Sequence, residues 1–221
     1  MEKQNLTIRN FAVISGIALL LMAVLAGIAN FTVVEKIKSA LTAGITGGDI
    51  LQTMAAQGRW AVVAFSIVAA LDVIVAWSLY GIFRPDMPSL SLLTAWFRLL
   101  YTAVFGVAIT VLFTSFRTAQ AGAVNVVEVF RFFEDTWMIA LFFFGIHLVL
   151  LGWLSVRSRH IHWIFGLLLI IAGAGYLFDT ILFLTAPDSN IGVALYTFIG
   201  EVVFIFWLLI KGSRIDSRAG S

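Results

Sequence analysis

The chain has 221 residues, of which 61% are hydrophobic and 12% charged, with a net charge of +2 at pH 7 and a mean hydropathy of +1.03. A soluble domain is nearer half apolar and a quarter charged, so this composition belongs in a lipid bilayer. The absence of cysteine excludes disulfides, thiolate metal sites and cysteine nucleophiles, and no Lys/Arg cluster indicates nucleic acid as a partner.

Six apolar segments are long enough to cross the bilayer as helices. A helix rises ~1.5 Å per residue, so about 20 apolar residues cross a hydrocarbon core of ~30 Å. For the first segment the alternative is a signal peptide with Gly27-Ile28-Ala29 as the cleavage motif, but the run exceeds the ~7–15 apolar residues of such a signal. The predicted spans are residues 11–34, 59–83, 92–116, 136–156, 163–184 and 191–210.

The connections between the predicted spans differ in character. Residues 35–58 and 117–135 are polar segments with apolar residues at roughly helical spacing, which predicts two short interfacial helical segments. Residues 84–89 contain two prolines and predict a tight turn. The sequence therefore predicts an all-α polytopic membrane protein, a six-helix bundle that forms a single membrane domain over residues 1–221.

Basic residues predict the orientation of the chain in the membrane. With six spans, both termini lie on one side, together with the turns after the second and fourth spans. Eight Lys and Arg residues lie on that side and five on the other. The positive-inside rule therefore places both termini in the cytoplasm, and residues 35–58 and 117–135 face outward.

Ionisable residues lie within or at the edge of the spans, where burial of a charge is costly and marks a candidate functional site. Asp72, His147 and Glu201 fall near the midplane, whereas Arg98 lies toward the cytoplasmic side and Asp179 toward the outer side. We predict a ligand-binding site formed by Asp72, Arg98, Glu134, His147, Asp179 and Glu201.

The balance of charge indicates the sign of the ligand. In one interpretation Arg98 pairs with Asp72 on the neighbouring helix, as a buried ion pair that fixes helix register. One arginine cannot neutralise Asp72, Asp179 and Glu201 together, so at least two of these carboxylates must be protonated, solvated or joined by a cation. The excess negative charge predicts a proton, a metal cation or a small polar or cationic molecule as the ligand.

A divalent metal is one form of this ligand. His147, Asp72 and Glu201 combine imidazole with carboxylates, a donor set that suits Zn, Fe or Mn. The chain lacks an H-x-x-x-H or H-E-x-x-H pair, and His147 is the one histidine inside a predicted span. A hydrogen-bonded packing role for His147 is therefore the alternative to metal ligation.

Several stretches carry a resemblance to a known family. They are Leu71–Trp77, Arg84–Leu99, Phe144–Gly152 and Gly173–Asp179. In these stretches the chain resembles a bacterial family of six-helix membrane proteins, the domain-of-unknown-function family 4386, over about residues 8–211. The resemblance implies a protein of the bacterial inner membrane and implies no activity, cofactor or catalytic residue.

Three functions remain open. The first is a binding or transport protein that uses the acidic midplane site. The second is an intramembrane metalloenzyme acting on a lipid-like or quinone-like substrate, and the third is a structural or sensory partner protein whose polar groups only hold helices together. In the fifth span, Gly173-Ala174-Gly175 predicts close helix packing, either within the chain or between copies in a homo-oligomer.

Overall fold

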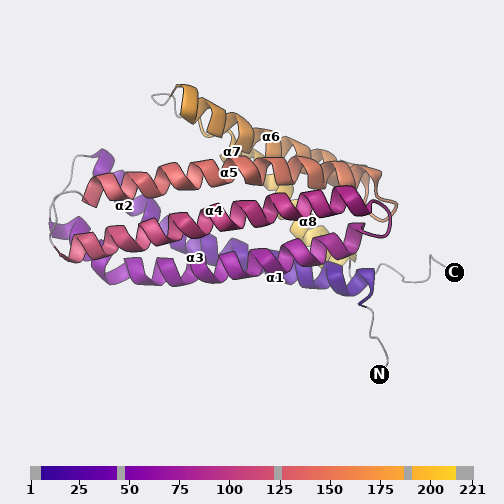
Figure 1. The fold of residues 1–221 in the computed structure, drawn as a ribbon, viewed down its shortest axis with the longest axis horizontal. Coiled ribbons are helices and arrows are strands. Elements are labelled where there is room, and N and C mark those ends of the chain that lie inside the picture. Colours follow the sequence, from indigo (N-terminus) through magenta and orange to yellow (C-terminus); the bar gives the residue numbers. More distant parts are fainter. Residues whose placement is uncertain (1–5, 44–47, 122–125, 187–190, 213–221) are drawn as a thin grey trace. The chain divides into compact units, whose positions relative to one another are not determined.

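In the part of the chain that the structure describes, all regular secondary structure is helical, and turns connect the helices (Figure 1). The structure is a computed structural model, and it describes residues 6–43, 48–121, 126–186 and 191–212, with side chains for all of these except 41–42 and 48–56. The helices are α1 (Ile8–Ala29), the π-helical η1 (Asn30–Val34), α2 (Glu35–Thr42), α3 (Gly48–Phe83), α4 (Pro88–Gln120), α5 (Val126–Arg157), α6 (Trp163–Thr185), α7 (Ala194–Thr197) and α8 (Ile199–Ile210).

Among the described residues, five helices are long and apolar enough to cross a membrane. The first runs through α1, η1 and most of α2, and the others lie in α3, α4, α5 and α6. The sixth apolar segment, Ala194–Ile210, is shorter and is divided between α7 and α8. This arrangement confirms the predicted class, an all-α polytopic membrane protein.

The two predicted interfacial segments belong to longer helices. Residues 117–120 end α4, and residues 126–135 begin α5. Residues 35–42 form α2, which follows α1 through η1 without a break, and residues 48–58 begin α3. Neither segment contains proline, so nothing removes a backbone donor where the apolar run stops, and the helices continue past it.

The chain forms two compact units, whose boundaries fall within α1, α3, α4 and α5. Unit 1 comprises Met1–Leu20, Asp72–Tyr101 and Leu141–Ser221, and unit 2 comprises Leu21–Leu71 and Thr102–Ala140. The midplane residues predicted from the sequence, Asp72, His147 and Glu201, all belong to unit 1.

Glycines bring α5 and α6 into close contact in unit 1. A Cβ atom at Gly152 would lie 2.5 Å from the carbonyl oxygen of Gly166, and one at Gly173 would lie 2.6 Å from that of Gly145. Real Cβ atoms do not approach this closely, so larger residues here would push the backbones apart. The close packing predicted for Gly173-Ala174-Gly175 is confirmed within the chain.

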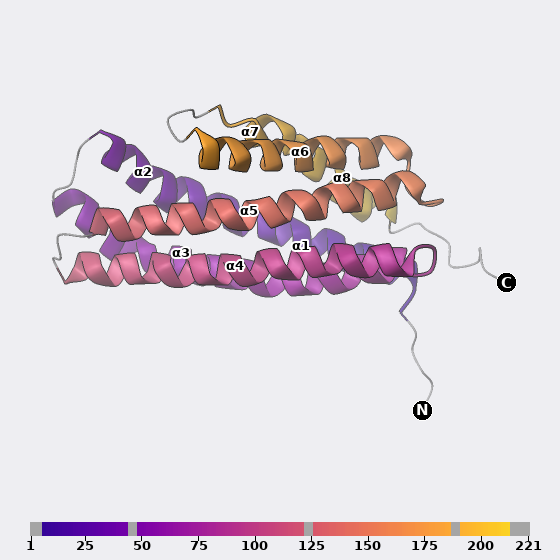
Figure 2. The ribbon, with the colours of Figure 1, turned by 45° about the horizontal axis from the view of Figure 1, so that its top comes forward.

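The last apolar segment of unit 1 is interrupted. Figures 1 and 2 show α7 and α8 beside α6, and a Cβ atom at Gly200 would lie 2.5 Å from the carbonyl oxygen of Leu168. Between α7 and α8, the backbone N–H of Glu201 donates to the carbonyl of Phe198, three residues earlier, at 2.9 Å, a tighter turn than the α-helix. The last apolar segment thus forms a bent pair of helical pieces, and Glu201 lies in the first turn of the second.

Candidate functional site

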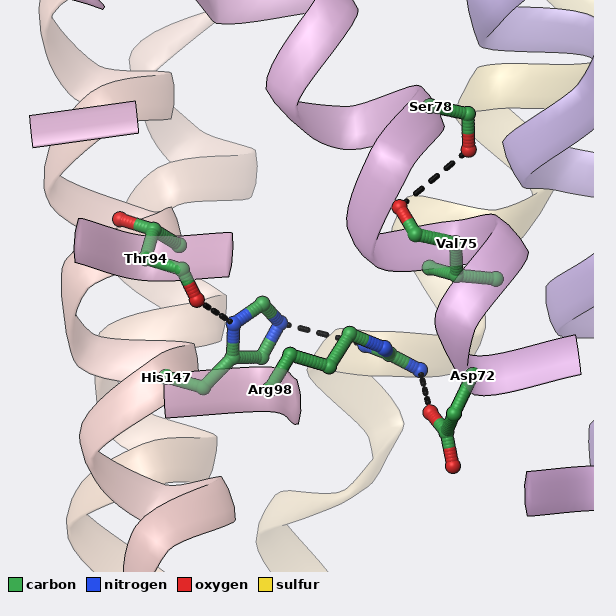
Figure 3. Close-up of polar contacts among 6 residues, drawn as sticks. All are labelled: Asp72, Val75, Ser78, Thr94, Arg98 and His147. Atoms are coloured by element: carbon green, nitrogen blue, oxygen red, sulfur yellow. Dashed lines mark hydrogen bonds and ion pairs between the residues drawn. The ribbon is translucent and has the colours of Figure 1, made fainter. Parts of the chain in front are cut away.

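Arg98 lies at the centre of a buried polar network in unit 1 (Figure 3). Its Nη2 is 2.6 Å from Oδ1 of Asp72 on α3, and its Nη1 donates to Nε2 of His147 on α5 at 3.1 Å. The three residues are at most 2% exposed. The predicted ion pair between Arg98 and Asp72 is confirmed, and it ties α3, α4 and α5 together.

His147 completes the network on the opposite side of Arg98. Its Nδ1 is 2.9 Å from the backbone carbonyl oxygen of Thr94, one turn before Arg98 on α4 (Figure 3). The carbonyl can only accept and the guanidinium can only donate, so this geometry fits a neutral ring with its proton on Nδ1. Both ring nitrogens therefore have partners, as the packing interpretation of His147 predicts.

His147, Asp72 and Glu201, the predicted metal ligands, are not grouped around a common point in the described part of the chain. Over the described ranges, no group of three or more His, Asp or Glu side chains is placed to hold a metal ion. The imidazole of His147 has no lone pair left over from its bonds to Arg98 and Thr94, and Asp72 binds the guanidinium. The described geometry gives the metal interpretation no support.

Aromatic rings surround the network. The ring of Phe144 stacks on that of His147 with centroids 5.9 Å apart, and the guanidinium carbon of Arg98 is 5.7 Å from the Phe144 centroid. The rings of Tyr101 and Tyr176 pack on the same phenylalanine at 4.9 and 5.3 Å. Phe144 thereby places two phenol side chains beside the charged groups.

Asp179 caps the start of α7. Its two carboxylate oxygens accept hydrogen bonds from the backbone N–H groups of Val193 and Ala194 at 2.9 and 2.7 Å. These donors begin a helix and have no partner within it, so a carboxylate is stabilised there by both hydrogen bonding and the helix dipole. Two backbone donors thus compensate the charge of Asp179.

Glu201 has no comparable compensation. Its hydrogen-bond partner is the hydroxyl of Tyr176 on α6, and it lies close enough to Arg98 to be attracted and to Asp72 to be repelled. Oε1 of Glu201 is inaccessible and, within the described part of the chain, has no hydrogen-bond partner; the same is true of Oδ2 of Asp72. Two carboxylate oxygens in unit 1 are thus buried and unsatisfied.

Tyr176 is not among the residues predicted from the sequence. The signal for it is a polar aromatic residue inside an apolar span, three residues before Asp179 and therefore on a nearby face of the same helix. Its contact with Glu201 joins residues 25 positions apart, which helical spacing alone does not predict.

Glu134, the remaining predicted site residue, belongs to unit 2. Its Oε1 is 3.6 Å from Nζ of Lys38, and both side chains are partly exposed, at 28% and 48%. A partly exposed ion pair of this kind contributes little to stability. Glu134 therefore has a cationic partner of its own, separate from the network around Arg98.

Comparison with known proteins gives a family and no activity. A family model described as "Domain of unknown function (DUF4386)" matches residues 14–212. A relative from Archaeoglobus fulgidus, named "Uncharacterized protein", is 35% identical over 157 residues, which cover 71% of this chain and 86% of the relative. No solved structure matches the chain.

Proposed function

This chain belongs to the DUF4386 family, whose description assigns it no function, and we propose that it is a membrane protein that binds or transports a proton or a small cation at Glu201 and Asp72. The observation that carries the proposal is the pair of buried carboxylate oxygens, one on each residue, that lack a hydrogen-bond partner among the described residues. Unsatisfied buried carboxylates are costly, so a proton or a cation would be stabilised there.

The partners of the charged residues in unit 1 indicate which carboxylates lack a full counter-charge. Arg98 binds Asp72 at 2.6 Å, and two backbone N–H groups hold Asp179. Glu201 accepts a hydrogen bond from the hydroxyl group of Tyr176, and Arg98 attracts it only at longer range. One guanidinium thus lies near two carboxylates, Asp72 and Glu201. It cannot neutralise both, so this pair carries the excess negative charge that the proposal assigns to the site.

The interruption between α7 and α8 also supports this location. Transporters place binding sites where a membrane helix is discontinuous, because the exposed backbone groups there can meet a ligand. Glu201 lies three residues after Phe198, the residue that separates the two helical pieces. The acidic group and the irregular backbone therefore coincide.

Carboxyl titration tests the proton form of the proposal. The purified protein in lipid would be titrated while infrared spectroscopy follows the absorption of protonated carboxyl groups. We expect Glu201→Gln to remove one titrating band and Asp72→Asn to shift it, whereas Glu128→Gln, at an exposed acid of α5, leaves it in place.

Cation binding and transport are tested with the same variants. Thermal shifts would be measured with Na⁺, K⁺, Mg²⁺ and Mn²⁺ in turn, and proton flux into liposomes would be followed with an enclosed pH-sensitive dye. The proposal fails if the carboxyl band, the cation shifts and the flux are all the same in wild type, Glu201→Gln and Asp72→Asn.

The orientation belongs to the same proposal. We infer that the protein lies in a plasma membrane with both termini in the cytoplasm, on the basis of the eight Lys and Arg residues on that side against five on the other. Fusion of a reporter that fluoresces only in the cytoplasm to the carboxyl terminus tests this inference. If this fusion does not fluoresce and a periplasmic reporter at the same site is active, the inferred orientation is wrong.

A further inference from the structure

Unit 2 contains a groove that lies outside the site proposed above. It has a volume of about 490 Å³, and its lining residues come from α1, η1 and Lys36 of α2 on one side and from α3 on the other. Two of the lining residues, Ala29 and Ala61, are small and buried, at 3% and 2% exposed. The whole lining falls within residues 21–71, so the groove belongs to unit 2 alone.

A π-helical stretch forms part of the wall. η1 (Asn30–Val34) contributes Thr32 and Val33 to the lining. A π-helical turn inside a longer helix is rare and frequently occurs at functional sites. Because this stretch lies between α1 and α2, it determines how the residues on the two sides of it face the groove.

The groove is polar at one end and apolar at the other. Lys36 and Gln57 are the lining residues nearest in sequence to the connection between α2 and α3, whereas Leu25 and Ala64 are the farthest from it. Lys36 is exposed and forms no ion pair with an acid in the residues that the structure describes. A ligand that fits this arrangement has an apolar tail and an anionic head.

The length of the groove matches one leaflet of a bilayer. Leu25 and Lys36 are 11 positions apart, which at ~1.5 Å per residue is about 16 Å. Half of a ~30 Å hydrocarbon core is about 15 Å. A lipid whose head lies at Lys36 would therefore extend its chain along the groove to about the middle of the membrane.

We propose that this groove binds an acyl chain of a phospholipid with a net negative headgroup, and that Lys36 contacts the phosphate. Apolar walls accept a chain of any phospholipid, and the cation at the rim selects the anionic one. The inference is independent of the ligand proposed at Glu201, because the two sites share no residue.

Trp60 provides the measurement, because it lines the groove and is 75% exposed. The protein would be placed in bilayers that mix phosphatidylcholine with brominated phosphatidylglycerol or, separately, with brominated phosphatidylcholine. Bromine quenches the fluorescence of a nearby indole. The protein has seven tryptophans, so the fluorescence of Trp60 is obtained as the difference between wild type and Trp60→Phe.

We expect the relative binding constant at Trp60 to favour phosphatidylglycerol about fivefold, the contribution of one lysine near a membrane surface. Lys36→Ala should bring the constant close to one. Lys38→Ala removes the same charge two positions away, where Glu134 already neutralises it, and should leave the preference intact. Equal quenching by both lipids in wild type, or an unchanged preference in Lys36→Ala, overturns the proposal, and protection of Trp60 from both lipids would show a protein partner on the groove instead.

Filling the groove gives a second test that does not depend on Trp60. Native mass spectrometry would count the phosphatidylglycerol molecules that remain bound after release from detergent. Ala64→Phe should reduce this count, whereas Ala70→Phe, at an exposed position outside the lining, should not. Identical counts in the two variants would contradict the proposal. This test remains available if Trp60→Phe does not fold and the quenching experiment cannot be carried out.

Discussion

The ion pair between Arg98 and Asp72 allows a quantitative prediction about stability. At 2.6 Å between Nη2 and Oδ1, the attraction is about 6 kcal/mol at an effective dielectric constant near 20. Desolvation offsets most of this, but removal of one partner leaves the other charge buried and costs about 3–5 kcal/mol. We therefore expect Asp72→Leu to lower the free energy of unfolding by that amount.

Arg98→Met should cost more than Asp72→Leu. The same guanidinium donates to His147 at 3.1 Å, and the loss of that hydrogen bond adds about 1 kcal/mol. The double variant removes both charges and replaces them with apolar groups, so it should regain most of the loss and lie about 1 kcal/mol below wild type. The expected interaction energy is thus several kcal/mol.

A double-mutant cycle in mixed micelles measures this quantity. Unfolding would be driven by increasing the fraction of denaturing detergent and followed by circular dichroism for the four proteins of the cycle. If the losses of the two single variants simply add in the double variant, to within about 1 kcal/mol, the pair does not hold the helices together. Glu201→Gln is the matched control, since it neutralises an acid of the same unit that has no ion pair in the described structure, and it should not destabilise the protein.

Three further substitutions follow from the packing. Gly152→Val should cost at least about 1–3 kcal/mol by overpacking, because its Cβ would lie 2.5 Å from a backbone oxygen, whereas Gly106→Ala, whose Cβ meets no atom within 4 Å, should have no measurable cost in the same unfolding assay. Asp179→Ala removes two hydrogen bonds to a carboxylate, each worth about 1.5–3 kcal/mol, and hydrogen exchange at the start of α7 should accelerate; unchanged exchange would show that the cap is not needed. Ser15→Ala breaks the 2.7 Å bond to Ser78 and should cost about 0.6 kcal/mol, the average for such bonds between membrane helices, as thermal unfolding would show.

The positions of the long helices follow from elementary properties of the sequence. Apolar length predicts where a helix crosses the membrane, and Pro85 and Pro88 predict the turn before α4, which begins at Pro88. The pairing of Arg98 with Asp72 follows as well, because a charge in an apolar span needs an opposite charge and these two residues lie on adjacent spans. Such predictions depend on one helix or on neighbours in the chain.

The rest of the site depends on contacts that are distant in sequence. From the sequence alone, Asp179 is a candidate ligand group. The structure shows that its carboxylate accepts hydrogen bonds from the backbone of residues 193–194. In the sequence, nothing distinguishes Tyr176 from other aromatic residues of an apolar helix. Its contact with Glu201 forms because α8 packs against α6. The break at Phe198 has no proline to mark it, so hydropathy predicts one uninterrupted span.

The glycine contact between α5 and α6 has a mechanical consequence. Where backbone meets backbone, there are no side-chain rotamers that could change and let one helix slide over the other. Such contacts also bring Cα–H groups close to carbonyl oxygens, which adds weak attraction along the whole interface. Within unit 1, α5 and α6 should therefore move as one rigid body, and α8, which meets the backbone of α6 at Gly200 in the same way, should move with them.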